Sequence, residues 1–346
     1  MRVLIASVLT PFVFGGAEVL VQDLRQALLQ EGHDVDLLTL PWAWNRLDLL
    51  IDHLTATRLM HIADQGPDTV DRVVAMKFPA YLLQHPHKVL WLMHQQRQAY
   101  ELWDDPLGLS RMPGGDAMRQ IIQHADRLAC GEIRSRFTIS ANVSRRLREQ
   151  LGIESIPMCP PPRHVDRLKP LAADDYFFFP SRLSPWKRQS LVLEAVARCR
   201  EPVRVRFAGF RDDSPQLAEM KARATELGIE SRVEWLGLLG DDDLVEVYGR
   251  SLAVIFPPFD EDYGYITVEA MAAAKAVITC EDSGGPMEWV DESTGWVTEP
   301  EPDAMAQALD EAWQDRAGTA RRGEQGRETF MERRLSWPHI VERLLA

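Results

Sequence analysis

The chain has 346 residues, of which 45% are hydrophobic and 26% are charged, and its formal net charge at pH 7 is −13. This length exceeds the usual size of a single hydrophobic core, so we expect two domains. No apolar run reaches the ~20 residues that a membrane-spanning helix needs. The acidic balance argues against nucleic-acid binding, which depends on a basic surface.

The cysteines and the first residues bear on the cellular compartment. The four cysteines are scattered and lack the paired spacing of zinc and redox motifs: Cys130, Cys159, Cys199 and Cys280. The sequence opens on the apolar run Val3–Ser7, without the pattern of a signal peptide. We therefore expect reduced thiols in a cytoplasmic protein, with weak peripheral contact at the inner membrane face as an option.

The charge is unevenly distributed along the chain. Residues 1–165 carry 17 Lys and Arg against 18 Asp and Glu, whereas residues 166–346 carry 22 against 34. The first half also contains a basic cluster, formed by Arg134, Arg136, Arg145, Arg146 and Arg148. We favour a solvated helix face as its interpretation. The alternative is a foothold on an anionic membrane surface or a phosphate-bearing substrate.

The first half alternates short apolar runs with segments of helical periodicity. The runs predict strands at 3–7, 35–40, 73–76, 88–93 and 128–130. The periodic segments predict helices over 17–30, 45–63, 115–126 and 141–151. This alternation is typical of a parallel sheet with helices on both faces.

The second half repeats this pattern after a group of prolines. Pro157, Pro160, Pro161 and Pro162 lie near mid-chain and are typical of an interdomain linker. We expect strands at 176–179, 203–208, 232–236, 252–256 and 276–280. We expect helices over 187–200, 215–228, 241–250, 265–274 and 303–315, and a last helix that ends near 345. The predicted domains are 1–163 and 164–335, followed by the helix 336–346.

An acidic turn between a strand and a helix is the most informative stretch. The apolar run 252–256 ends in two prolines, and a helical pattern begins at Tyr265. Glu261 lies in the turn and Glu269 in the helix, so both carboxylates can line one pocket at the carboxyl edge of a sheet. Chance is an equally good explanation when the spacing is considered alone.

Other candidates also follow strands. Gly15 and Gly16 open the first helix, where backbone N–H groups favour an anion, although a Gly pair is more often a turn. Arg182 and Lys187 follow the strand 176–179 and suit a diphosphate. His94 ends the strand 88–93, where a substrate contact and a structural role are equally compatible with the sequence.

A second glycine corner follows the strand 276–280. It reads Ser283-Gly284-Gly285-Pro286, and the Gly-Pro pair predicts a helix start that presents N–H groups to a ligand. No group of His, Asp and Glu residues has the spacing of a metal site. No dinucleotide fingerprint or P-loop is present.

Together these corners resemble the retaining family 4 glycosyltransferases of the GT-B fold. The resemblance rests on the order and spacing of Gly15-Gly16-Ala17-Glu18, Arg182 with Lys187, Glu261 with Glu269, and Ser283-Gly284-Gly285-Pro286. It implies an α/β protein of two Rossmann-like, doubly wound parallel-sheet domains that face each other across a cleft. It also implies that the helix 336–346 crosses back to the first domain.

The resemblance implies a role for each candidate. Glu269 would bind the ribose of a nucleotide sugar, and Arg182 and Lys187 would bind its diphosphate. The donor sugar would lie at Glu261 and the backbone after it, formed by Asp262, Tyr263, Gly264 and Tyr265. Gly15 and Gly16 would approach the phosphates, and His94 would lie beside the transferred sugar. The implied chemistry needs neither a metal nor a cofactor.

We therefore expect a retaining glycosyltransferase that uses a UDP- or GDP-sugar. The acceptor can be a glycan, a lipid-linked intermediate or another small molecule, and Arg97 and Tyr100 are candidate residues on the acceptor side. Two alternatives stay open. One is a nucleotide-sugar epimerase or hydrolase on the same fold, and the other is a non-catalytic partner subunit that binds a nucleotide sugar.

Overall fold

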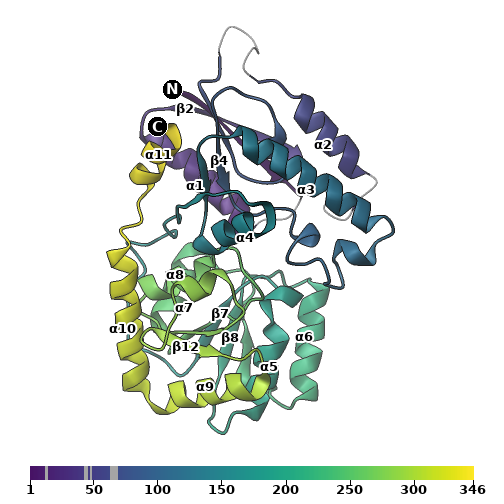
Figure 1. The fold of residues 1–346 in the computed structure, drawn as a ribbon. Coiled ribbons are helices and arrows are strands. Elements are labelled where there is room, and N and C mark those ends of the chain that lie inside the picture. The colour runs from purple at the N-terminus through teal and green to yellow at the C-terminus, as the bar shows by residue number, and fades with distance from the viewer. Residues whose placement is uncertain (12–14, 43–45, 47–48, 63–68) are drawn as a thin grey trace. The chain divides into compact units, whose positions relative to one another are not determined.

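The structure is a computed structural model that describes residues 1–11, 15–42, 46, 49–62 and 69–346. It divides into two compact units (Figure 1). The first unit comprises Met1–Pro160 together with Leu335–Ala346, and the second comprises Pro161–Arg334. None of the helices in the described ranges is both long enough and apolar enough to cross a membrane.

The first unit is built on a six-stranded parallel sheet of order β2-β1-β3-β4-β5-β6. Its strands are β1 (Arg2–Leu9), β2 (Asp34–Pro41), β3 (Arg72–Ala75), β4 (Lys88–Leu92), β5 (Arg136–Thr138) and β6 (Ile156–Pro157). Its helices are α1 (Gly16–Gln30), α2 (Leu50–Leu59), α3 (Gly115–Glu132), α4 (Ala141–Leu151) and α11 (Trp337–Leu345).

The second unit contains a second six-stranded parallel sheet, of order β12-β11-β10-β7-β8-β9. Its strands are β7 (Phe177–Pro180), β8 (Val205–Ala208), β9 (Val233–Trp235), β10 (Val254–Ile255), β11 (Val277–Cys280) and β12 (Gly295–Thr298). Its helices are α5 (Gln189–Arg198), α6 (Pro215–Glu226), α7 (Asp241–Arg250), α8 (Tyr265–Ala272), α9 (Pro302–Gln314) and α10 (Arg316–Glu332).

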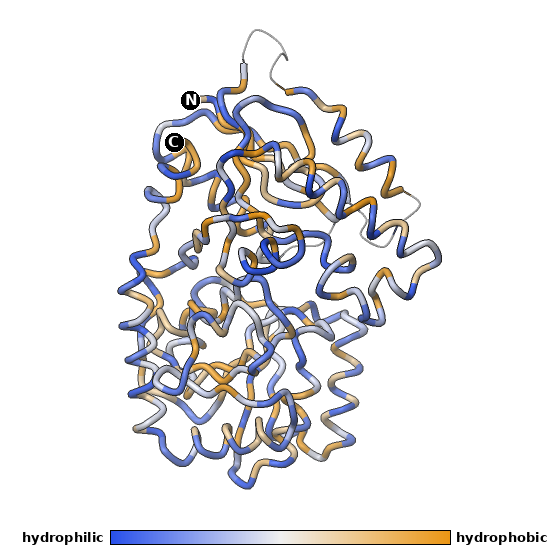
Figure 2. Tube along the Cα trace, in the orientation of Figure 1, coloured by the Kyte–Doolittle hydropathy of each residue, from blue (hydrophilic) through white to orange (hydrophobic). Residues whose placement is uncertain are grey.

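The central strands of both sheets are buried along most of their length, with exposure confined to their end residues. Helices on both faces of a parallel sheet exclude water from each strand, so such strands consist of continuous apolar residues. Phe177–Phe179 and Val73–Ala75 are fully buried examples. Figure 2 shows hydrophobic residues gathered on the inner strands of each unit, with hydrophilic residues along the outer helices. The short apolar runs therefore predicted the central strands.

The last helix, α11, belongs to the first unit. Its buried residues Ile340, Val341 and Leu344 form one face, and the helix packs against α1. Trp337 lies edge-on to Trp91 of β4, with ring centroids 6.1 Å apart. Burial of this apolar face attaches the end of the chain to the first sheet.

One prediction about secondary structure was wrong. The run 128–130 is not a strand but the last part of α3, in which Ile122, Ala129 and Cys130 are buried while Leu128 is 50% exposed. The apolar residues here belong to an amphipathic helix, and three residues were too few to reveal the 3.6-residue period of its hydrophobic face. The strand expected there lies at β5, which begins with an arginine.

Helix α10 was not predicted, and its composition explains why. The buried face of α10 consists of Gly318, Thr319, Gly323, Gly326 and Phe330, so it lacks the apolar stripe that marks a helix in a sequence. A Cβ added to Gly323 would lie 2.2 Å from the carbonyl oxygen of Ala274. Glycine is therefore required for the close approach of α10 to the end of α8. Strand β12 was not predicted either.

This close approach leads to a prediction about stability. Replacing a glycine by alanine inside a helix normally stabilises a protein by about 0.4–1 kcal/mol. We expect Gly323→Ala to destabilise the second unit instead, by about 1–3 kcal/mol, because the methyl group overlaps the Ala274 backbone. Urea unfolding measures this change. Gly131→Ala in α3 is the control, since a Cβ there has nothing within 4 Å. Equal effects of the two substitutions would contradict the prediction.

Candidate active site

The candidate site of the second unit lies on the loops that follow β7, β10 and β11. These three strands are neighbours in one parallel sheet, so their following loops emerge at the same edge. The carboxyl edge of such a sheet is where ligands of open α/β folds bind. The loop after β7 carries Arg182 and Lys187, and the loop after β10 carries Glu261. The loop after β11 carries the Gly-Gly-Pro corner.

Backbone hydrogen bonds fix the loop after β10 to the loop after β11. The N–H groups of Asp260 and Glu261 donate to the carbonyl oxygens of Asp282 and Ser283, at 2.8 and 2.9 Å. The N–H of Gly285 donates back to the carbonyl of Glu261 at 2.8 Å. Because these bonds involve only the main chain, they set the position of Glu261 whatever the neighbouring side chains are.

Two glycines make these hydrogen bonds between the two loops sterically possible. Gly284 has φ 71° and ψ −116°, a backbone conformation that residues other than glycine rarely adopt. A Cβ on Gly285 would lie 2.5 Å from the carbonyl oxygen of Tyr263. The Gly-Gly-Pro corner is therefore explained first by this contact between two loops.

Lys187 and Glu261 form a close ion pair. The Nζ atom of Lys187 lies 2.5 Å from Oε2 of Glu261, and the two side chains are 13% and 22% exposed. The same ammonium group lies over the ring of Phe256, 5.1 Å from its centroid. A partly buried ammonium can exchange a carboxylate for a phosphate oxygen, because both are anionic oxygen acceptors. The structure thus brings together two of the predicted site residues.

Arg188 anchors the start of α5 to the loop after β11. Its guanidinium group forms two parallel hydrogen bonds with the carboxylate of Asp282, both 2.6 Å long. Arg188 has φ 57°, and it follows the short turn Pro185–Lys187. This bidentate pair joins the loop that carries Lys187 to the loop that holds Glu261 in place.

Glu269 lies on α8 and is oriented by a tyrosine. The hydroxyl of Tyr248 on α7 donates to Oε2 of Glu269 at 2.6 Å. Burial raises the pKa of Glu269 above its ordinary value, while the Tyr248 bond and the charge of Arg163 oppose this shift. The other oxygen of Glu269 has no hydrogen-bond partner among the described residues. A carboxylate held in this way can accept hydrogen bonds from a vicinal diol.

The remaining residues predicted at the donor side differ in exposure. Arg182 is exposed, and it forms no ion pair within the described part of the chain. Tyr263 is 2% exposed and packs edge-on against Tyr265, with ring centroids 5.1 Å apart. Its side chain therefore supports the loop, and a ligand would meet the backbone there. Gly264, at φ 86°, precedes the first residue of α8, and Asp262 is half-buried in the same turn.

Gly15 and Gly16 begin α1 of the first unit. The carboxylate of Glu18 accepts a hydrogen bond from the N–H of Gly15 at 2.9 Å. The Glu18 side chain therefore already occupies one of the N–H groups at the helix N-terminus that we predicted to face a phosphate. A bound anion would have to displace it. Residues 12–14, which precede this corner, lie outside the described residues.

His94 follows β4 after one further residue. Its Nδ1 atom lies 2.6 Å from the carbonyl oxygen of Gln95. A carbonyl can only accept, so Nδ1 carries the proton and Nε2 has the lone pair when the ring is neutral. This geometry fixes the tautomer of the predicted substrate-facing histidine.

The two candidate acceptor residues are part of buried polar networks. Arg97 lies 2.7 Å from a carboxylate oxygen of Glu101, which also binds Arg146. Tyr100 is 5% exposed and donates to Asp126 at 2.6 Å, as does Tyr81. Tyr100 therefore has a structural role in this network, and its position on the acceptor side stays a prediction. Burial raises the pKa of Asp126 to about 6.

The basic cluster of the first half also separates into different environments. Arg146 is buried against Glu101, and Arg136 donates to the carbonyl oxygens of Cys130, Ile133 and Glu154. Arg145 pairs with Glu149 on the surface of α4. The cluster is therefore not one solvated helix face.

Sequence reasoning missed Tyr248, Asp282 and Asp126. Tyr248 is 21 residues from Glu269, and Asp282 is 94 residues from Arg188. No local spacing reveals such pairs, because sheet topology brings them together. Within the described residues, no group of three or more His, Cys, Asp and Glu side chains could hold a metal ion.

Comparison with known proteins identifies the class. Residues 166–329 match the model of the family described as "Glycosyl transferases group 1". This match spans most of the second unit, and the two parallel-sheet units have the architecture of the GT-B fold. The resemblance to family 4 glycosyltransferases is confirmed at this level.

Individual relatives are distant. The O-antigen chain mannosyltransferase C of Escherichia coli is 27% identical over 184 residues, which cover 52% of this chain and 48% of that protein. The chain spans about half the length of the curated relatives it matches first.

Two solved structures share the fold over nearly the full chain. Sucrose-phosphate synthase of Thermosynechococcus elongatus has a TM-score of 0.76 at 16% identity, with 99% of this chain and 97% of that chain covered. The HepE protein of Anabaena in complex with UDP-glucose has a TM-score of 0.67 at 18% identity, with 99% and 98% covered.

The Tyr248–Glu269 bond leads to a prediction about ligand affinity. We expect Tyr248→Phe to lower the affinity for a nucleoside diphosphate roughly tenfold, because a hydrogen bond to a charged group contributes about 1.5–3 kcal/mol. Calorimetric titration measures this change. Tyr176→Phe is the matched control, since its hydroxyl donates to the carbonyl of Val247. An equal loss of affinity in both variants would contradict a specific role for Tyr248.

The structural role of Tyr100 leads to a separate prediction. Tyr100→Phe removes one of two hydroxyl donors from the buried Asp126. We expect the free energy of unfolding to fall by about 1–3 kcal/mol, because a buried polar group loses a partner. Tyr81→Phe should have a similar effect. Unchanged stability together with a raised KM for an acceptor would show instead that Tyr100 contacts the acceptor.

Proposed function

We propose that this chain is a retaining, metal-independent glycosyltransferase that transfers a sugar from a UDP- or GDP-sugar to an acceptor hydroxyl. The observation that carries the proposal is the grouping of Lys187, Glu261 and Glu269 around one sheet edge, within the segment that matches the family. This grouping combines a cation for a phosphate with two carboxylates for hydroxyl groups.

Each residue has a distinct part in the proposed reaction. Glu269, held by Tyr248, accepts hydrogen bonds from the ribose hydroxyls. Lys187 leaves Glu261 to bind the diphosphate, and the exposed Arg182 adds a second cation. Glu261 then receives hydroxyl groups of the donor sugar. The exchange keeps Lys187 paired with an anion throughout, which limits the cost of desolvation.

The proposed chemistry balances without a cofactor. The bond between the anomeric carbon and the β-phosphate oxygen breaks, and the acceptor oxygen attaches to the same face of the sugar. The acceptor proton passes to an oxygen of the departing diphosphate. Lys187 and Arg182 stabilise the charge on this diphosphate, which is the part that a metal ion has in other enzymes.

The acceptor is proposed as a carbohydrate, either free or lipid-linked. The Escherichia coli relative is named as an O-antigen chain mannosyltransferase, and the Anabaena neighbour was solved with UDP-glucose. These names support a nucleotide-sugar donor and a glycan product. They do not favour the epimerase, the hydrolase or a non-catalytic subunit.

The first experiment tests the donor residues. We expect Glu269→Ala and Arg182→Ala each to lower nucleotide-sugar affinity roughly hundredfold, since each removes a charged contact. Calorimetric titration measures this affinity, first with UDP, GDP, ADP and dTDP and then with the corresponding nucleotide sugars. Glu246→Ala and Arg250→Ala are the controls, because these two residues form a surface pair on α7. Unchanged affinity in both site variants would refute the assignment.

The second part of this experiment tests the reaction. Product analysis by NMR should show the anomeric configuration of the donor preserved in the product. The rate should be unchanged by EDTA. Release of free sugar without an acceptor would indicate a hydrolase, and an epimerised donor without nucleotide release would indicate an epimerase. Tight donor binding with no turnover would indicate a non-catalytic subunit.

A further inference from the structure

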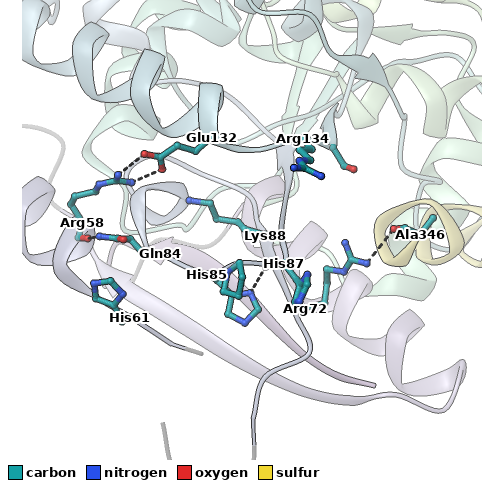
Figure 3. A pocket seen from close by; sticks show the side chains of 12 residues that line it. Arg58, His61, Arg72, Gln84, His85, His87, Lys88, Glu132, Arg134 and Ala346 are labelled. Carbon is teal, nitrogen blue, oxygen red and sulfur yellow. Dashed lines mark hydrogen bonds and ion pairs between the residues drawn. The ribbon is translucent and has the colours of Figure 1, made fainter. Parts of the chain in front are cut away.

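A cavity of about 830 Å³ lies at the amino edge of the first sheet (Figure 3). We call it the amino-edge cavity and define it by Arg58, Arg72, Lys88, Glu132 and Arg134, with His85 and His87 beside them. Arg72 and Lys88 are the first residues of β3 and β4. His94 follows the other end of β4, so the cavity is separate from the predicted acceptor side.

The positive charge of this cavity is only partly compensated. Arg58 forms two hydrogen bonds with Glu132, at 2.7 and 2.5 Å, and the two side chains neutralise each other. Lys88 donates to the carbonyl oxygens of Tyr81 and Leu83, at 2.7 and 2.6 Å. Among the described residues, neither Lys88 nor Arg134 forms an ion pair. The cavity thus concentrates positive charge in a protein whose net charge is −13.

The burial of Lys88 makes the positive charge of its ammonium group energetically unfavourable. Burial lowers the pKa of Lys88 to about 8, although Glu132 acts in the opposite direction. An ammonium that is withdrawn from water without a carboxylate in contact favours the approach of an anion. In Figure 3 the Lys88 side chain extends between Arg58 with Glu132 on one side and Arg72 with Arg134 on the other.

Arg72 contributes a buried donor without a partner. Its terminal Nη2 atom donates to the main-chain oxygens of Leu345 and Ala346, at 2.8 and 3.2 Å. Its Nε atom is buried and has no hydrogen-bond partner among the described residues. Buried donors are normally satisfied, so an orphaned one next to a cavity indicates an acceptor that is missing from the protein itself.

We propose that the amino-edge cavity binds a phosphate-bearing anion, with Lys88, Arg72 and Arg134 as its cationic contacts. Arginine and lysine are the usual partners of phosphate oxygens. The volume is that of a small-molecule site and exceeds the needs of a single inorganic phosphate. The ligand is therefore a polyphosphate or an organic phosphate, and its source is either a free metabolite or a lipid headgroup.

Binding of inorganic tripolyphosphate tests the proposal. Titration calorimetry at fixed ionic strength compares the full-length protein with Arg134→Glu and Arg148→Glu. Arg148 is exposed on α4, outside the cavity, so both variants change the net charge equally. We expect Arg134→Glu to weaken binding roughly tenfold or more, because it removes a charge-assisted contact and adds repulsion. Arg148→Glu should change the affinity by less than about twofold.

A second arm distinguishes the sources of the phosphate. Co-sedimentation uses phosphatidylcholine vesicles with and without phosphatidylglycerol. Loss of vesicle binding in Arg134→Glu but not in Arg148→Glu, without tripolyphosphate binding, supports the site with a lipid headgroup as its ligand.

Two outcomes overturn the proposal. One is an equal effect of both substitutions in either arm, and the other is no binding of the wild-type protein to either probe. Thermal unfolding confirms that each variant is folded, which is expected because Arg134 is exposed. The loops of the second unit are identical in all three proteins, so the result is independent of the proposed transferase activity.

Discussion

The backbone joint between residues 259–264 and 282–285 determines the geometry of the second unit's candidate site. It consists of main-chain hydrogen bonds between two loops that follow adjacent strands. Gly284 supplies a left-handed φ, and Gly285 leaves room for the carbonyl of Tyr263. A side chain at Gly285 would collide with that carbonyl group, and one at Gly284 would strain the backbone. The position of Glu261 therefore depends on two residues that carry no reactive group.

Several further contacts rest on this joint. The carboxylate of Asp282, within the joint, accepts two hydrogen bonds from the guanidinium group of Arg188. This pair fixes the turn that carries Lys187. Glu261 then meets Lys187, and α8 begins at a defined point with Glu269 on its second turn. Because α8 also packs against the glycine face of α10, its direction is fixed from the opposite side. The candidate site is thus held by contacts whose partners lie on different strands, loops and helices.

The sequence predicted what local patterns encode. Buried central strands are visible as apolar runs, and the Gly-Gly-Pro corner marks a turn with special backbone geometry. Helix α10 was missed because its contact face consists of glycines, which carry no hydrophobic signal. The three residues 128–130 were misassigned because so short a run has no measurable period. The partners Tyr248 and Asp282 could not be predicted, since their contacts depend on which strands become neighbours in the sheet.

The candidate groups are paired within their own units, and this determines how a ligand can bind. Lys187 is held by Glu261, Glu269 by Tyr248, and the N-terminus of α1 by Glu18. A donor phosphate gains only the difference between its contact with Lys187 and the Lys187–Glu261 contact that it replaces. The displaced Glu261 must in turn find donors, and the hydroxyl groups of a sugar are suitable ones. A nucleoside diphosphate alone does not supply these sugar hydroxyl groups to Glu261. Under the proposed function, we therefore expect the site to bind the complete nucleotide sugar more tightly than its nucleotide product.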